Sequence, residues 1–517
     1  MNQIKAGAVL NYVIIVLNTL VGLAYTPYML RCLGQNEYGL YSLVASIIAY
    51  LTILDFGFGN AIIRYTAKFR TEGKKQEQWE MFGMFLIVYS IIGIIAIGIG
   101  LTLYFNVDML FSRTMTTDDL RQAQVMMLLL TFNLAFTFPL SIFGAIITAY
   151  ENFVFQRIIN ILRIVLSTGV LILVLSMGFK AIALVVVQTI FNLLTLIINY
   201  IYCKKKLKIQ IIFGKFDIPF IKEICLYSFW IFINAIIDKV YWGTGQFVLG
   251  AICGTAAVAI FSIGILFQQM YMSFSYAFSS VLLPKVTSMV TLQKSNSEIS
   301  NIFIKTGRLQ SFVLQFILSG FIIFGSKFIT LWAGNEYYDS YIIALMFMLS
   351  LYIPAIQSTG ILILQARNNL KFRTLVYLGI SILAVVLEIF LSRNYGALGC
   401  ATGIITVLLI GQGVIINIYY KIKQNIDIIS FWKSIIIMWI PTICLTVISW
   451  YATRFLSIKS MLDLFVWIMT YSIIYIPLSF KLSLNTNERN MITLPLTRLY
   501  RKLLPYGFKN KGNHESH

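Results

Sequence analysis

The chain carries one long hydrophobic pattern twice, in the same order. The segment Gly34-x-x-x-Tyr38-Gly39-Leu40-Tyr41-Ser42 is matched 220 residues later by Gly254-x-x-x-Val258-Ala259-Ile260-Phe261-Ser262. A short polar break that holds Arg157 is matched in the same way by a break that holds Arg373. A duplicated apolar unit favours a membrane protein whose two halves enclose a solute pathway.

The composition favours helices that cross a bilayer. Only 12% of the 517 residues are charged, and the mean hydropathy is +0.82. A soluble protein of this length carries about 25% charged residues. Apolar runs of about 20 residues recur with short breaks, which is the length that an α-helix needs to span the hydrocarbon core. The first run, residues 6–30, is too long for a signal peptide, so we expect it to be the first span.

We therefore expect an all-α integral membrane protein with about 14 transmembrane helices. The predicted spans are residues 8–30, 38–63, 81–105, 124–150, 158–177, 181–203, 224–250, 256–283, 309–331, 341–364, 374–391, 397–420, 434–452 and 461–480. They group into an N-lobe (1–203), a cytoplasmic linker (204–223), a C-lobe (224–420), two appended helices (421–480) and a basic cytoplasmic tail (481–517).

The basic residues are distributed very unevenly between the two sides of these spans. The side that holds both termini carries 30 of the 40 Lys and Arg residues, and the opposite side carries 8. The positive-inside rule then places both termini in the cytoplasm. The net charge of +20 is explained by this topology, so no nucleic-acid partner is expected.

The repeat also predicts how the lobes are related. Six spans separate equivalent points, so the two six-helix lobes share one topology and should be related by a pseudo-two-fold axis along the membrane normal. Pro139 and Pro354 occupy matched places inside spans, where each removes a backbone donor and bends its helix. They are either packing positions or hinges on which each lobe rocks.

Charged residues near the bilayer centre are candidates for function because they are costly there. Asp238 and Lys239 lie about 14 residues into the seventh predicted span. Asn234, Asp238, Trp242 and Gln246 form a row at i, i+4 spacing down one helix face. The row either lines a hydrated cavity or forms interhelical hydrogen bonds, each worth about 1 kcal/mol.

Other polar residues occur singly in the predicted spans. Asn18 is the repeat partner of Asp238 and would line the opposite wall of the same cavity. Arg163 either extends to the membrane interface or binds phosphate, whose oxygens a guanidinium group matches in pairs. Asp55 lies in Asp55-Phe-Gly-Phe-Gly-Asn60, where the glycines allow close helix approach or local unwinding. For Glu388, extension to the interface or helix pairing is favoured over ion coupling.

The sequence argues against an enzyme, a metalloprotein or an ATP-driven pump. The only adjacent acids, Asp118 and Asp119, lie in a short external loop, and there is no Walker A sequence. Membrane transferases generally need clustered carboxylates to hold Mg²⁺ on a diphosphate. The six cysteines are scattered, and the two histidines, His514 and His517, lie in the last four residues. No cofactor or metal site is expected.

Two stretches resemble a known family. Residues 27–41, Pro-Tyr-Met-Leu-Arg-Cys-Leu-Gly-Gln-Asn-Glu-Tyr-Gly-Leu-Tyr, and residues 54–65, Leu-Asp-Phe-Gly-Phe-Gly-Asn-Ala-Ile-Ile-Arg-Tyr, are similar to the polysaccharide flippases of the O-antigen and teichoic-acid type. These belong to the multidrug/oligosaccharidyl-lipid/polysaccharide (MOP) exporter superfamily. The resemblance implies a MATE-like fold and a place in the bacterial cytoplasmic membrane. It makes Arg31 and Arg64 candidate pathway residues.

The resemblance implies that the cargo is an undecaprenyl-diphosphate-linked oligosaccharide. The cargo would move from the cytoplasmic to the outer leaflet by alternating access, with H⁺ or Na⁺ coupling. On this view Arg31 and Arg64 serve the substrate pathway. Arg163 and Lys239 are candidates for the same pathway from their places in the predicted spans alone, and Asp55, Asp238 and Glu388 are ion-coupling candidates. Membrane lipids and glycan-assembly proteins are the expected partners. The alternatives are a drug/cation antiporter of the same superfamily and a membrane glycan polymerase or ligase.

Overall fold

The structure is a computed structural model that describes residues 3–214, 218–455, 458–490 and 493. Parts of the predicted linker (204–223) and most of the predicted tail (481–517), with both histidines, lie outside these residues. The helices are α1 (Gln3–Leu51), η1 (Thr52–Asp55), α2 (Phe58–Thr71), α3 (Lys75–Phe111), α4 (Thr117–Ala149), α5 (Phe153–Ser176), α6 (Ala181–Lys205), α7 (Ile218–Ile252), α8 (Thr255–Thr291), α9 (Asn296–Trp332), η2 (Asn335–Tyr337), α10 (Tyr338–Ile356), α11 (Ser358–Ala366), α12 (Leu370–Leu408), η3 (Leu409–Ile415), α13 (Ile416–Ile422), α14 (Ile428–Thr453) and α15 (Met461–Ser483).

The predicted all-α membrane architecture is confirmed. Eleven helical stretches of the described chain are long and apolar enough to cross a membrane, so this is a multi-pass membrane protein. Two of these stretches contain a glycine outside the helical region, Gly34 (φ 76) in α1 and Gly396 (φ 56) in α12. α7, with 35 residues, is a further long helix outside that set. The number 14 stays a prediction.

The chain forms two compact units. Unit 1 comprises Met1–Met270, Ile329–Ser350 and Lys371–Gly411, and unit 2 comprises Tyr271–Phe328, Leu351–Leu370 and Gln412–His517. These bounds run differently from those of the predicted lobes, because α7 and parts of α8, α10 and α12 belong to unit 1 with α1–α6. The division into lobes stays a prediction.

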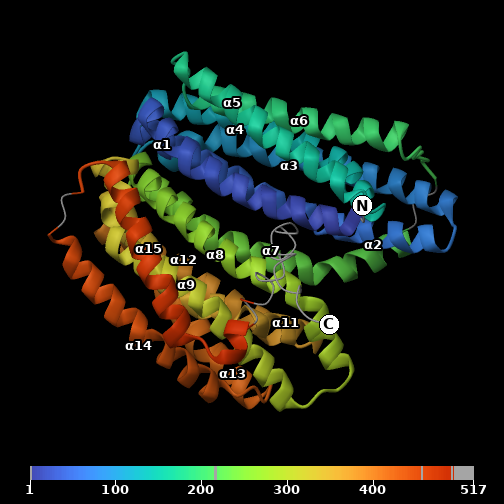
Figure 1. Ribbon diagram of the computed structural model, residues 1–517. Coiled ribbons are helices and arrows are strands. Elements are labelled where there is room, and N and C mark those ends of the chain that lie inside the picture. Colours follow the sequence, from blue (N-terminus) through green and yellow to red (C-terminus); the bar gives the residue numbers. More distant parts are fainter. Residues whose placement is uncertain (1–2, 215–217, 456–457, 491–492, 494–517) are drawn as a thin grey trace, which may run out of the picture. The chain divides into compact units, whose positions relative to one another are not determined.

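Unit 1 is built on long side-by-side helix pairs. α3 packs along α4, α4 along α6, and α1 along α5 (Figure 1). Small residues permit the closest approach, since a Cβ at Gly93 of α3 would lie 2.7 Å from the carbonyl oxygen of Ala135 in α4. Between these helices lies a core of buried aromatic and aliphatic side chains that includes Phe82, Tyr89 and Phe138. Tight packing of small residues is how membrane helices associate without a hydrophobic driving force.

At the Gly34 end of unit 1, matched segments of the two repeats touch each other. A Cβ at Gly39 would collide with the carbonyl group of Thr255, the first residue of α8, and would lie 3.2 Å from the Ala259 nitrogen. The Thr114 hydroxyl donates a hydrogen bond to the Gly250 carbonyl oxygen at 2.7 Å. We call these four segments, around Gly39, Thr114, Gly250 and Thr255, the Gly39 contact. It closes this end of unit 1.

The connection between α6 and α7 is held against α3. The Ile212 backbone N–H donates to the Trp79 carbonyl oxygen at 3.3 Å. A Cβ at Gly83 of α3 would collide with the Ile212 carbonyl group, so only glycine lets the connection lie so close. This part of the predicted linker is therefore a packed segment of unit 1.

In unit 2, buried polar groups join α9 to α14 and α15. The Arg308 guanidinium forms a two-pronged ion pair with Glu488, at 2.7 and 3.0 Å, and donates to the carbonyl oxygens of Ser434 and Ser483. The Thr442 hydroxyl donates to Gln315 at 3.1 Å. The helices that the sequence predicts as appended are thus bound to α9 through a hydrogen-bonded interior.

Candidate functional site

α7 contacts the first two helices at several points along its length. Phe232 stacks on Phe56 with ring centroids 4.5 Å apart, and the hydroxyl groups of Tyr50 and Thr244 lie 2.7 Å apart. Near the start of α7, Glu223 accepts a hydrogen bond from the Tyr65 hydroxyl at 2.8 Å. α7 is therefore packed against the N-terminal repeat along much of its length.

The predicted polar row of α7 contacts helices that come later in the chain. Thr374 of α12 donates to Asn234 at 3.4 Å, and Gln246 donates to Ser262 of α8 at 2.7 Å. The Trp242 ring lies 6.0 Å from that of Phe347 in α10. The row thus faces helices α8, α10 and α12. Asn234 and Gln246 make the interhelical hydrogen bonds that the sequence left as the alternative, and the cavity-lining role of the row stays a prediction.

A charged cluster surrounds the middle of this row. It consists of Asp238, Lys239, Arg373 and Tyr377, and we call it the Asp238 cluster. Arg373 and Lys239 attract the Asp238 carboxylate electrostatically, Arg373 more strongly. The Arg373 guanidinium lies 4.3 Å over the Tyr377 ring, and its Nε is buried with no hydrogen-bond partner. Two cations beside one carboxylate leave a positive charge available for an anion, and a guanidinium group fits phosphate oxygens.

The three acidic candidates have very different surroundings. Asp55 accepts a hydrogen bond from the Tyr89 hydroxyl at 2.7 Å and others from the backbone N–H groups of Gly57 and Gly59. It therefore caps the start of α2 after a local unwinding, in which Phe56 (φ 51) and Gly57 (φ 73) are left-handed.

Glu388 has no such partners. Its side chain is 0% exposed, and neither carboxyl oxygen has a hydrogen-bond partner. Extension to the membrane interface, one of the two favoured interpretations of this residue, is excluded by the burial. Asp238, in contrast, is exposed.

The remaining predicted residues lie apart from the Asp238 cluster in the chain. Arg31 lies three residues before the Gly34 interruption, whereas Arg64 lies in the middle of α2, and both are exposed. Asn18 is exposed on α1, and Arg163 is half-buried on α5. Their roles in a substrate pathway stay predictions.

The two matched prolines differ in their effect on the helix. α4 continues through Pro139 to Ala149, whereas α10 ends at Ile356, two residues after Pro354. Gln357 separates α10 from α11 and donates to Asn417 at 2.7 Å. The predicted hinge role is thus accompanied by an interruption only at the second proline.

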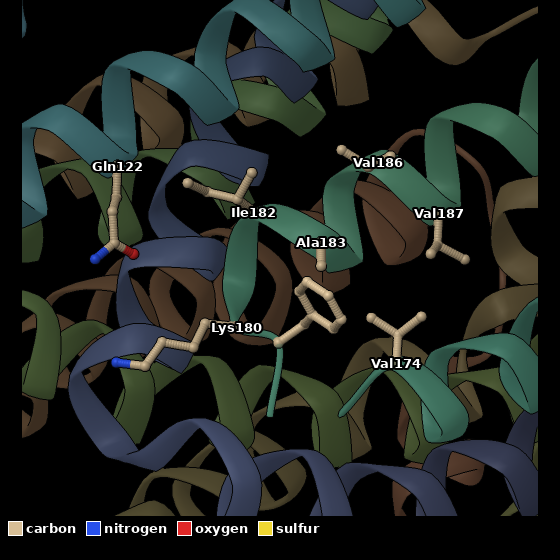
Figure 2. Close-up of a pocket in the computed structure, with 8 residues that line it drawn as sticks. Gln122, Val174, Lys180, Ile182, Ala183, Val186 and Val187 are labelled. Carbon is tan, nitrogen blue, oxygen red and sulfur yellow. The ribbon is translucent and has the colours of Figure 1, made fainter. Parts of the chain in front are cut away.

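A pocket of about 660 Å³ lies between the ends of α4, α5 and α6. Figure 2 shows that its walls are mostly apolar, with Val174, Val186 and Val187 among them, and that Lys180 and Gln122 are its polar members. Lys180 forms an ion pair with Glu37 at 2.7 Å, and the hydrogen bond with Glu37 raises the pKa of this lysine. None of the predicted site residues lines this pocket, and its apolar walls suit a lipid chain better than a sugar.

The comparisons with known proteins assign the family. Residues 4–290, more than half of the chain, match the model of a family described as "Polysaccharide biosynthesis protein". The chain belongs to this family. The predicted family is confirmed. No curated protein matches the sequence.

Solved structures confirm the fold of the chain. A structure described as "Lipid II flippase MurJ, inward closed conformation" is 16% identical, with a TM-score of 0.69 over 95% of this chain and 99% of that chain. An inward-facing MATE family multidrug transporter of the MOP superfamily is 13% identical, with a TM-score of 0.64 over 82% of this chain and 99% of that chain. An outward-facing MATE transporter is 14% identical, with a TM-score of 0.54 over 83% and 96%. The MATE-like fold is therefore shown.

The sequence does not distinguish Arg373 and Tyr377, the two α12 members of the Asp238 cluster, from other polar residues. The repeat marks Arg373 only as the partner of Arg157, in a polar break between predicted spans. In the structure it is the third residue after the start of α12 and half-buried. An i, i+4 spacing with Tyr377 was the available signal.

Proposed function

We propose that this membrane protein moves an undecaprenyl-diphosphate-linked oligosaccharide from the cytoplasmic to the outer leaflet by alternating access, for surface polysaccharide biosynthesis. The family match is the single observation that carries this proposal. The likeness of the fold to a lipid II flippase over 95% of the chain supports it. The proposed function is transport of an intact molecule, without catalysis and without a cofactor. The protein resides in the bacterial cytoplasmic membrane, with both termini in the cytoplasm.

The Asp238 cluster is the proposed site for the diphosphate. Arg373 and Lys239 supply two positive charges on membrane-spanning helices, where an unpaired anion is costly. Tyr377 supports the guanidinium group through its ring face. Asp238 attracts both cations while no substrate is bound, and the diphosphate replaces this carboxylate as their counter-ion.

The remaining predicted residues are assigned to the translocation path. Asn18, Asn234, Trp242 and Gln246 contact the sugars, and Arg31, Arg64 and Arg163 attract the anionic headgroup at the two membrane surfaces. Pro139 and Pro354 permit the lobes to rock. Membrane lipids, and the proteins that assemble the glycan, are the expected partners.

Deletion of the gene is the direct test of the function. We expect lipid-linked oligosaccharide to accumulate on the cytoplasmic leaflet, and surface glycan to return when the wild-type gene is restored. The double variant Asp238→Ala, Lys239→Ala should fail to restore it. Normal glycan assembly in that variant would contradict the proposed site. Normal glycan assembly after deletion, together with increased drug sensitivity, would favour a drug exporter.

A single substitution tests the role of Arg373. Arg373→Ala should weaken binding of the diphosphate lipid by about 10–150-fold, because a hydrogen bond to a charged group contributes about 1.5–3 kcal/mol. Binding is measured by intrinsic fluorescence with undecaprenyl diphosphate in detergent micelles.

The matched control is Arg393→Ala, which removes an exposed arginine from the same helix. It should bind the lipid as the wild type does. Equal binding by the Arg373 variant and the wild type would remove Arg373 from the proposed site.

A further inference from the structure

We propose that the Glu388 carboxyl group binds the proton that accompanies the return of the carrier after it has released its cargo. This inference rests on the proposed transport function and adds the identity of the coupling ion and of the residue that binds it. The argument starts from the surroundings of the side chain in unit 1.

Glu388 lies in the first half of α12, eight residues before the interruption at Gly396, or about 12 Å at 1.5 Å per residue. The second half of α12 packs directly against it, since a Cβ at Gly403 would lie only 2.9 Å from the Glu388 nitrogen. The side chain is 0% exposed, and both carboxyl oxygens are buried without a hydrogen-bond partner. An ionised carboxylate without a partner is very costly in such a place, so the group is neutral in this conformation.

The neighbouring side chains confirm that nothing compensates a negative charge. In the described part of the chain, the titratable groups that interact electrostatically with Glu388 are Tyr50 of α1, Tyr241 of α7 and Cys400 of α12. The Tyr241 hydroxyl donates to the Ile404 carbonyl oxygen at 2.9 Å, and that of Tyr50 lies 2.7 Å from Thr244. All three are neutral donors with other contacts, and none is a cation.

The same neighbours favour a proton over a metal ion. Hard cations such as Na⁺ need several oxygen ligands, and thiols are poor ligands for them. Across the described residues, no group of three or more His, Cys, Asp or Glu side chains is placed to hold a metal ion. A proton needs a single carboxyl oxygen, which Glu388 supplies.

The Gly39 contact connects the charge of Glu388 to the conformation of unit 1. Gly250 near the end of α7 and Thr255 at the start of α8 flank the turn that carries Cys253. The Cys253 thiol donates to the carbonyl oxygen of Ser392, one helical turn after Glu388. When this end is closed, the turn is therefore attached to the segment that holds Glu388.

Closing the Gly39 contact thus favours the neutral form of Glu388, and opening it lets water reach the carboxyl group and ionise it. A ligand shifts such an equilibrium by its difference in affinity for the two forms. The proton is the ligand that binds better to the closed form. The carrier then closes the Gly39 contact with one proton on Glu388 and gives up that proton when water reaches the group from the other side.

The first experiment detects the neutral acid in the full-length protein in lipid vesicles. Infrared difference spectra between neutral and alkaline pH should contain the carbonyl stretch of a buried carboxylic acid, because exposed carboxylates are already ionised at neutral pH. Glu388→Gln should lose that band, since the amide has the same shape and never ionises. The matched control, Glu336→Gln, removes an exposed carboxylate and should keep it. An unchanged spectrum in Glu388→Gln would overturn the proposal.

A second measurement uses the wild-type chain and so does not depend on the folding of a variant. Dicyclohexylcarbodiimide enters membranes and reacts with protonated carboxyl groups. Peptide mass spectrometry should find the label on Glu388, and labelling should fall as the pH rises. Labelling of Glu388 at or below the level of Glu336 would contradict the proposal.

A third measurement separates this proposal from the proposed function. In vesicles with undecaprenyl-diphosphate-linked oligosaccharide, the wild type should export faster when a pH difference is imposed, and Glu388→Gln should lose this acceleration. Acceleration that persists in the variant would overturn the role of Glu388. A wild type that moves no lipid-linked oligosaccharide, but shows the acid band and the label, would contradict the cargo and leave Glu388 as a proton site.

Discussion

Replacing Arg308 with alanine is expected to lower the free energy of unfolding by about 3–5 kcal/mol. The side chains of Arg308 and Glu488 are only 8% and 5% exposed. The substitution leaves the Glu488 carboxylate buried without its cation, and it also removes a donor to each of the carbonyl oxygens of Ser434 and Ser483. Unfolding of the purified protein in detergent, followed by circular dichroism, measures the loss.

The control is Arg454→Ala, because this arginine is exposed and lies 4.1 Å over the Trp450 ring. An exposed cation–π contact contributes about 0.5–1 kcal/mol, so the control should lose no more than that. The double variant Arg308→Met, Glu488→Leu removes both charges and should be more stable than Arg308→Ala. A loss below about 1 kcal/mol in Arg308→Ala would show that the buried pair does not hold α9 to α15.

Replacing Gly39 with leucine is expected to open the Gly34 end of unit 1. The neighbours that a side chain would meet are backbone atoms of Thr255 and Ala259, which have no rotamers through which to move aside. Overpacking of this kind costs about 1–3 kcal/mol. A cost of that size, confined to the closed form, shifts the equilibrium towards the open form by about 5–150-fold.

The native Cys253 reports on this opening, because it is half-buried in the turn that belongs to the Gly39 contact. Its rate of reaction with a maleimide, measured by peptide mass spectrometry, should rise in Gly39→Leu. Gly98→Leu is the control, since a Cβ there would meet nothing within 4 Å. An equal rate in both variants would show that the Gly39 contact does not control access to this end.

The sequence predicts the parts of the molecule that depend on local pattern. Apolar runs, Gly34 and Gly254 at matched places and the glycines after Asp55 are all visible in one dimension. The structure gives both Gly34 and Gly254 a left-handed conformation, with φ of 76° and 89°. Solvation and backbone sterics act within a few residues, so they leave local patterns of apolar residues and glycines that can be identified in the sequence.

Contacts between distant helices leave no such signal. The partners of Asp238 include Arg373, which is 135 positions away, and the absence of partners around Glu388 depends on α1, α7 and α12 together. The sequence identified Asp55 and Glu388 as similar candidates. Only the packing of the helices shows that Asp55 caps the start of a helix and that Glu388 is a buried acid without a hydrogen-bond partner. The site was therefore predictable in its residue types and not in its pairing.

The segment between α6 and α7 is a connection that is packed against a helix along its backbone. Its backbone is hydrogen-bonded to Trp79 and packs against Gly83. A tag or protease site inserted at 206–214 would therefore separate this segment from α3. The turn at Gln293, between α8 and α9, is exposed and connects two helices of unit 2 by a few residues. A protein with a reporter domain inserted at Gln293 should fold, and so should a protein expressed as two fragments divided there. The same changes within residues 206–214 should prevent folding.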